Sequence, residues 1–170
     1  MKTITFKEDI LSAIVAVIIF IALVSCEQDP VTPKLATAPG GGTLSNYKAY
    51  ALDPAPGQGD VSGRVVFWKD NANNTLVQIS LYNTSEDTGY PTGLYKGSAD
   101  AGPVAELMPL YSIDGTTGEF GVSKFYVIGD KNFYNGIDAL DAHIRILAGS
   151  TLIASGNVGR NSKPVASEGD

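Results

Sequence analysis

From residue 47 to residue 159 the chain alternates short runs rich in Val, Ile, Tyr and Phe with clusters of Gly, Asn, Asp and Pro. Residues of the first kind favour strands and those of the second favour turns. Strands are predicted near 47–52, 61–69, 75–82, 105–113, 121–128, 142–148 and 151–155. Helical character is limited to the segment 132–141. The pattern predicts an all-β, antiparallel sandwich or barrel of about seven to eight strands.

Segment 75–82 shows the clearest alternation. One face carries Val77, Ile79 and Leu81, and the other carries Gln78, Ser80 and Tyr82. This period of two predicts a strand with one face on a core and the other in water. Ile144 and Ile146 are expected to face the same core. Asp70–Asn74 and Asp114–Gly118 have turn composition and are predicted to join neighbouring strands as hairpins.

The N-terminal segment has the composition of an export signal. Lys2 and Lys7 are positively charged, although Glu8 and Asp9 cancel part of that charge, and an apolar run interrupted only by Ser12 follows from residue 10 to residue 24. The run ends in Leu23-Val24-Ser25-Cys26, which resembles the lipobox of bacterial lipoproteins. Residues 1–25 are therefore predicted to be a lipoprotein signal peptide, and Cys26 to be the lipid-bearing residue.

A transmembrane anchor is the alternative for this segment. A membrane-spanning helix needs about 20 apolar residues, whereas the run from 10 to 24 has 15. We therefore expect an exported protein held by lipid on a bacterial membrane, the outer membrane at its periplasmic or surface face. Glu27-Gln28-Asp29 resembles the acidic signals that send some lipoproteins to the cell surface.

Cys26 is the only cysteine in the chain, so no disulfide can form within it. The exported part must be stabilised by its core alone, which is feasible because a chain of about 150 residues buries roughly 70% of its unfolded surface. Residues 26–46, rich in Pro and Gly, are predicted to be the lipidated cysteine and a flexible tether. Residues 47–159 are predicted to be the folded domain, and 160–170 a disordered tail.

The net charge is −6, and no stretch is rich in Lys or Arg. Binding of nucleic acid requires clustered positive charge. The composition therefore excludes nucleic acid as a partner.

The order of features from about residue 60 to residue 159 resembles the CHRD domain, which is similar to the Greek-key sandwich of the Cu/Zn superoxide dismutases. The resemblance rests on four stretches of the sequence: Gly63-Arg64-Val65-Val66-Phe67, Asn74 to Leu81, Gly102-Pro103-Val104-Ala105-Glu106-Leu107, and Leu152-Ile153-Ala154-Ser155-Gly156-Asn157-Val158-Gly159. It implies an antiparallel Greek-key sandwich.

The positions that hold the metal in those families are different in this chain. Their His-x-His pair corresponds to Gly93 and Tyr95, and a later histidine corresponds to Leu147. A cysteine of the last strand, which the dismutases join to a loop and which is not a metal ligand, corresponds to Ser155. Copper or zinc would need several imidazoles, and the chain has one histidine. We therefore expect no metal cofactor and no dismutase activity.

His143 could in principle form a hydrolase triad with Asp138 or Asp141 and a serine. No Gly-x-Ser-x-Gly motif is present, and a histidine at the surface or at a strand end is the simpler interpretation. Asp70–Asn74, or Asp138 with Asp141, could offer oxygen ligands to Ca²⁺. Turns are rich in Asp and Asn for conformational reasons alone, so neither set predicts a calcium site by itself.

Five aromatic residues are candidates for contact with a ligand: Trp68, Tyr90, Tyr95, Phe133 and Tyr134. In loops or at strand ends, such rings could stack on a sugar or anchor a protein partner. Alternatively, most of them cover the core.

The sequence favours a non-enzymatic binding or assembly module anchored to the cell envelope, with a protein or glycan as ligand and the covalent lipid as its only added group. The alternatives are a calcium-dependent or enzymatic protein with an unrecognised site, and a carbohydrate-binding module that uses the loop aromatics.

Overall fold

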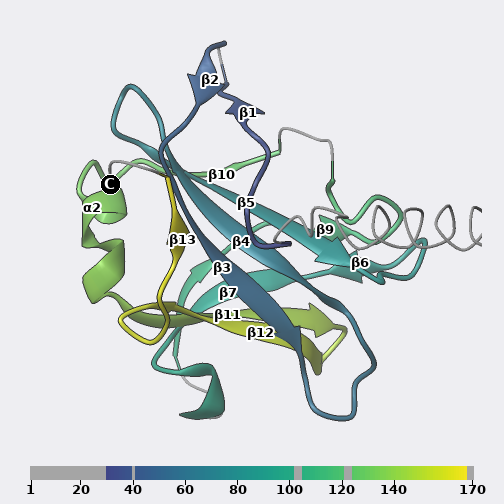
Figure 1. Ribbon diagram of the computed structural model, residues 1–170. Helices are drawn as coiled ribbons and strands as arrows, with labels where there is room; N and C mark the ends of the chain where they lie inside the picture. The colour runs from purple at the N-terminus through teal and green to yellow at the C-terminus, as the bar shows by residue number, and fades with distance from the viewer. Residues whose placement is uncertain (1–29, 40, 102–104, 121–123, 168–170) are drawn as a thin grey trace, which may run out of the picture.

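The computed structural model describes residues 30–39, 41–101, 105–120 and 124–167. Most strands belong to one curled antiparallel sheet in the order β10–β5–β4–β3–β12–β11–β7–β8, with β13 beside β3 (Figure 1). Their bounds are β3 Tyr47–Pro54, β4 Ser62–Lys69, β5 Thr75–Tyr82, β7 Thr92–Lys96, β8 Glu106–Pro109, β10 Tyr126–Ile128, β11 Asp141–Ala148, β12 Thr151–Gly159 and β13 Val165–Ala166. The predicted all-β, antiparallel class is confirmed.

Two small ribbons and three short helical turns complete the described fold. The ribbons pair β1 (Ala36–Thr37) with β2 (Thr43–Leu44) and β6 (Gly89–Tyr90) with β9 (Ile113–Asp114). The helical turns are η1 (Ala99–Ala101), α2 (Phe133–Gly136) and η2 (Ile137–Ala139). The last two lie within the segment predicted to have helical character.

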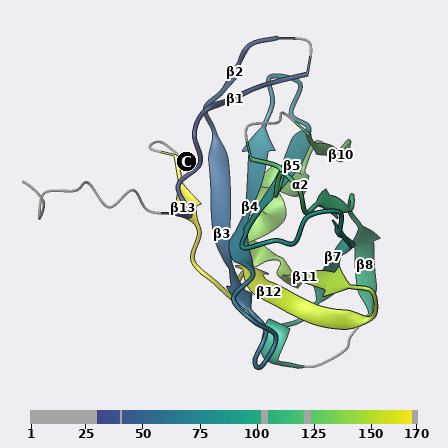
Figure 2. The same cartoon turned by 90° about the vertical axis from the view of Figure 1, so that its right-hand side faces the viewer.

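The sheet folds back on itself where β12 meets β3. These strands share only two register pairs, Ala154 with Pro54 and Ser155 with Asp53. On either side of this narrow junction the two halves of the sheet lie face to face, with β3, β4 and β5 in one layer and β11, β7 and β8 in the other (Figure 2). The late strand β12 lies beside β3, the first of the three sequential strands β3, β4 and β5, and in the other layer β7 pairs with the late strand β11.

The main core fills the space between the two layers. It contains Val77, Ile79 and Leu81 of β5 together with Ile144 and Ile146 of β11, all fully buried. The alternation in 75–82 thus correctly predicts which residues face this core, because successive side chains of a strand point to opposite faces.

The opposite face of β5 is not simply in water, contrary to the expectation. Tyr82 is exposed, but Ser80 is buried and Gln78 is half-buried. This outer face carries a second apolar cluster, made of Leu44, Ala49, Val66, Trp68 and Leu76. The cluster needs a cover of its own, since it lies outside the main core.

Segments predicted to be flexible provide that cover. Val31, Ala36 and Ala38 pack on the second cluster from the N-terminal side, and Val165 of β13 packs on it from the C-terminal side. The predictions of a tether through residue 46 and of a disordered tail from residue 160 are therefore wrong for the described residues 30–39, 41–46 and 160–167. The physical reason is the apolar outer face of β3–β5, which these segments shield from water.

The strand predictions also fail elsewhere in the described chain. The sequence does not predict β7, and the segment 105–113 is divided between β8 and β9. Asp114–Gly118 forms a turn but not a hairpin, because β9 pairs with β6 whereas β10 pairs with β5. Asp70–Asn74 does form the predicted hairpin connection, between β4 and β5.

Candidate functional site

The five aromatic candidates do not share an exposed surface. Trp68, Tyr90 and Tyr134 are 0%, 3% and 3% exposed, which removes them as ligand contacts. Only Tyr95 and Phe133 keep part of their surface in water. Tyr90 and Tyr95 also lie in β6 and β7, not in a loop as expected. The alternative interpretation, that most of these rings cover the core, is the correct one.

The buried rings have structural partners. Trp68 Nε1 donates a hydrogen bond of 3.1 Å to Gln78 Oε1 in the second cluster. The Tyr90 hydroxyl accepts a hydrogen bond of 2.9 Å from the Ser85 amide. The Tyr134 ring lies 5.1 Å from the ammonium nitrogen of Lys48, within the range of a cation–π interaction. The first two contacts pair the buried Trp68 Nε1 and the buried Tyr90 hydroxyl, as buried polar groups require.

Tyr95 belongs to a polar and aromatic patch on the outer face of β7 and β11, which we call the β7–β11 patch (Glu106, Tyr95, His143 and Arg145). Tyr95 is paired in register with His143, and their ring centroids are 5.8 Å apart. The Arg145 guanidinium lies 5.3 Å from the centroid of the Tyr95 ring. The patch brings a cation, an aromatic ring and a carboxylate together on strands of the sheet.

Gly93 makes room for this arrangement. A Cβ atom at this position would lie 2.7 Å from Glu106 Oε1 and 2.8 Å from Tyr95 Cε2. The tyrosine ring and the carboxylate therefore occupy the space above the glycine backbone. Sequence reasoning interprets this glycine as part of a loop, and so does not detect the patch.

The candidate catalytic groups are engaged elsewhere. His143 is 1% exposed, and its Nδ1 lies 2.8 Å from the carbonyl oxygen of Gly97. Asp138 pairs with Lys48 at 2.8 Å, and Asp141 pairs with Arg160 at 2.6 Å.

The strongest influence on Asp141 is a hydrogen bond from the Asn161 amide, which with Arg160 holds the pKa of this carboxyl below its ordinary value. Both acids thus have structural partners, and Gly97 is the hydrogen-bond partner of His143.

The positions matched to the metal ligands of the resembled families lie on one outer face. Tyr95 pairs with His143 and Gly93 with Arg145, so by alternation Leu147 points to the same side. Glycine, tyrosine and leucine provide no imidazole, and these residues do not fit copper or zinc. Among the described residues no group of three or more His, Cys, Asp or Glu side chains could hold a metal ion.

The candidate calcium loop uses its carboxylate to close the turn. Asp70 Oδ1 accepts hydrogen bonds from the amides of Ala72 (2.8 Å) and Asn74 (2.7 Å), and Oδ2 accepts one from Asn74 Nδ2 (2.7 Å). Desolvation, the largest influence, raises the pKa of Asp70, but the hydrogen bonds from Asn74 and Ala72 together bring it below its ordinary value. The conformational explanation of this Asp/Asn cluster accounts for its contacts.

This hairpin makes stability depend on pH. Because the pKa of Asp70 is lower in the folded state, its stabilising effect is complete above the unfolded pKa of about 3.9 and is lost as the pH falls through the folded pKa. We expect Asp70→Asn to be less stable than the wild type at neutral pH, and the difference to shrink below about pH 4. Denaturant melts across this range measure it, with the exposed Asp60→Asn as control. A difference that stays constant with pH would contradict the charge effect.

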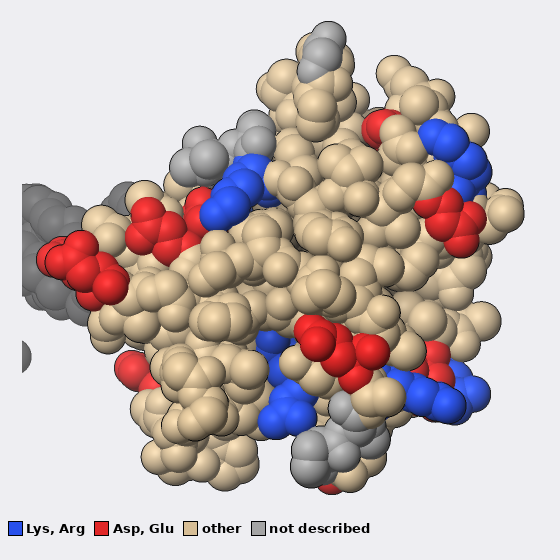
Figure 3. Space-filling model, turned by 180° about the vertical axis from the view of Figure 1, so that it is seen from behind, with Lys and Arg blue, Asp and Glu red and all other residues tan. Residues whose placement is uncertain are grey.

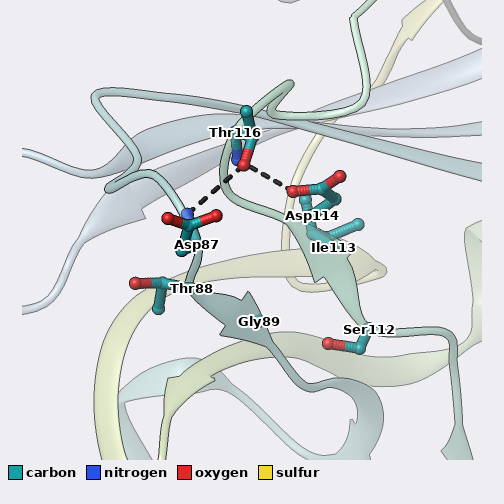
Figure 4. Close-up of a pocket in the computed structure, with 7 residues that line it drawn as sticks. All are labelled: Asp87, Thr88, Gly89, Ser112, Ile113, Asp114 and Thr116. Carbon is teal, nitrogen blue, oxygen red and sulfur yellow. Dashed lines mark hydrogen bonds between the residues drawn. The ribbon is translucent and has the colours of Figure 1, made fainter.

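An open groove lies beside the β6–β9 ribbon. It has a volume of about 410 Å³ and polar walls formed by Asp87, Thr88, Gly89, Ser112, Ile113, Asp114 and Thr116 (Figure 4). Thr116 bridges the two sides, since its hydroxyl accepts from the Asp87 amide at 3.3 Å and its amide donates to Asp114 Oδ1 at 2.9 Å. The groove offers two carboxylates and hydroxyl groups, a surface suited to hydrogen bonding. Sequence reasoning interprets Asp114–Gly118 only as a turn and does not find it.

The charges visible on the molecule are dispersed. Viewed from behind, Lys and Arg side chains alternate with Asp and Glu around the rim, and much of the centre is uncharged (Figure 3). No broad cationic surface of the kind that nucleic acid requires appears on this face.

Cys26 and the predicted signal peptide lie outside the described residues. Within the part of the chain that is described, no helix is long and apolar enough to cross a membrane. Comparisons with protein-family models, curated proteins and solved structures give no match for this chain.

Proposed function

We propose that the protein is a bacterial envelope lipoprotein, anchored to a membrane through lipid on Cys26, whose β-sandwich acts in binding or assembly and not in catalysis. The observation that carries this proposal is Leu23-Val24-Ser25-Cys26 at the end of an apolar run of 15 residues. A thiol at this place provides the sulfur for acylation. Val31, five residues after Cys26, packs on the second cluster of the domain.

The contacts of the polar groups support a binding role. His143, Asp138 and Asp141 each have a structural partner, whereas a triad requires base and acid to bond each other and a nucleophile. The β7–β11 patch is built on rigid strands and combines Arg145, Tyr95 and Glu106. Arg and Tyr are the residue types that most often dominate protein interfaces, so a protein partner is the ligand we favour for this patch.

A CHRD-like sandwich without the metal site remains our proposal for the family. Its support is the strand order, with β12 beside β3 and β7 beside β11, and the placement of Gly93, Tyr95 and Leu147 on one face. We further propose the outer membrane as the location. Protease treatment of intact cells tests which face of the outer membrane carries the protein. A protein on the cell surface is digested, whereas one on the periplasmic face is protected.

Lipidation gives a direct prediction. Wild-type protein expressed in a bacterial host should carry acyl mass on Cys26 and enter the detergent phase, because each buried methylene contributes about 0.8 kcal/mol of membrane affinity. Cys26→Ala should remain unacylated and uncleaved by the lipoprotein pathway, whereas Gln28→Ala, two residues further on, should behave as the wild type. Mass spectrometry of the N-terminal peptide measures the modification. An unmodified Cys26 in the wild type would refute the proposal.

A further inference from the structure

Arg64 fixes the first described residues of the chain to the domain. Arg64 Nη1 donates hydrogen bonds to the carbonyl oxygens of Thr32 (2.7 Å) and Pro30 (3.2 Å). Val31, between these two residues, packs against the second cluster. Arg64 thus binds the backbone on both sides of Val31. These bonds fix the point at which the N-terminal segment leaves the sheet.

Covalent geometry then limits the distance between the anchor and the domain. Four peptide units join Cys26 to Pro30, so their Cα atoms can be at most about 14 Å apart. This is less than half of the roughly 30 Å hydrocarbon thickness of a bilayer. An acylated Cys26 therefore keeps the Arg64 end of the sheet close to the membrane surface.

That end of the sheet carries an aromatic pair. The rings of Tyr82 and Phe120 are 4.5 Å apart, and Tyr82 is 38% exposed. The Arg64 guanidinium lies 5.8 Å from the centroid of the Phe120 ring. The backbone supports the pair, because the Leu81 amide donates to the Gly118 carbonyl oxygen at 3.0 Å and so joins the end of β5 to the turn before Phe120.

The aromatic pair at this end suits the headgroup region of a bilayer. Tyrosine combines an apolar ring with a hydroxyl group and is favoured at membrane interfaces. The chain has a net charge of −6, so anionic lipid gives no general attraction. The lipid that fits is zwitterionic phospholipid.

We propose that the end of the sheet formed by Arg64, Tyr82 and Phe120 faces the membrane and that the aromatic pair lies among zwitterionic phospholipid headgroups. This inference rests on the proposed lipidation of Cys26. The described N-terminal segment acts as a short docked link that orients the domain, and the opposite end of β5 points away from the membrane.

Quenching of tryptophan by brominated lipid tests the orientation. The lipidated full chain is reconstituted in phosphatidylcholine vesicles brominated near the start of the acyl chain, with Trp68 kept as a buried background. Tyr82→Trp places a probe at the proposed contact. Val127→Trp is the matched control, because Val127 is 53% exposed and pairs with Leu76, about 20 Å along β5 from Tyr82.

After subtraction of the wild-type signal, the Tyr82→Trp probe should lose about half or more of its emission, since interfacial side chains lie roughly 5–10 Å into the bilayer surface. The Val127→Trp probe should lose none. Adding Arg64→Gln to Tyr82→Trp should reduce the quenching while flotation with vesicles is kept. Equal quenching of both probes, or quenching unaffected by Arg64→Gln, would overturn the orientation.

The two proposals fail in different ways. Absence of acyl mass on Cys26, or of flotation, defeats the proposed lipoprotein function. Acylated protein that floats with the vesicles but leaves the Tyr82→Trp probe unquenched defeats only the orientation. Circular dichroism of each variant confirms that the β-fold is kept.

Discussion

Ile79→Ala is expected to lower the free energy of unfolding by about 2–5 kcal/mol, the usual cost of cutting a fully enclosed aliphatic side chain back to Ala. Ile79 is 0% exposed and lies in the main core between the two layers of the sheet. The cost includes the lost burial and the cavity left among rigid strands. Denaturant melts of the soluble fragment that lacks residues 1–26 measure it.

Val127→Ala is the matched control, because Val127 is a β-branched residue on the neighbouring strand but is 53% exposed. Its substitution should change the free energy of unfolding by less than about 0.5 kcal/mol. If both variants lost similar stability, the assignment of Ile79 to an enclosed core and of Val127 to an exposed edge of the sheet would be wrong.

The sequence-based prediction for β5 and the structure give different expected costs for the loss of the Gln78 side chain. The sequence predicts a wet side chain, whose removal would cost less than about 0.5 kcal/mol. In the structure Gln78 accepts the hydrogen bond of Trp68 Nε1, and the Trp68 side chain is fully buried. Its loss would leave a buried donor without that acceptor, which typically costs about 1–3 kcal/mol.

The fold class and the main core could be predicted because they depend on local patterns. Alternation along 75–82 assigns Val77, Ile79 and Leu81 to one face of the strand, and in the structure that face packs in the main core. The second cluster could not be predicted in this way. It depends on Val31 and Val165, which lie more than 100 residues apart in segments whose Pro, Gly and Ser content indicates flexibility.

The candidate site shows the same limit. An aromatic residue beside Gly and Pro is compatible with a loop ligand site and with a strand that closes a sheet, and composition does not distinguish them. Tyr90 is buried in β6, whereas Tyr95 remains on the outer face because Gly93 leaves room for its ring. The pairing of β7 with β11 decides between these outcomes. Pairing between strands about 50 residues apart cannot be predicted from the local sequence of either strand.

Gly156 is the position where the smallest change should have a large effect. A Cβ atom there would lie 2.0 Å from the carbonyl oxygen of Ala51 and 2.9 Å from Leu52 Cδ2. The first of these is a backbone atom and cannot be relieved by a change of rotamer. The clash falls beside the two register pairs that join β12 to β3, so the methyl group of alanine must push apart the junction on which the curled sheet depends.

We therefore expect Gly156→Ala to cost about 3 kcal/mol, at the upper end of the usual penalty for overpacking. Gly129→Ala is the control, because a Cβ atom at the exposed Gly129 meets nothing within 4 Å and its φ is not positive. That variant should be neutral, or more stable by about 0.4–1 kcal/mol, because alanine lowers the conformational entropy of the unfolded chain relative to glycine. Thermal and denaturant melts of both variants measure the contrast. If Gly156→Ala were as stable as Gly129→Ala, the close approach of β12 to β3 would be refuted, and with it the junction that brings the two layers face to face.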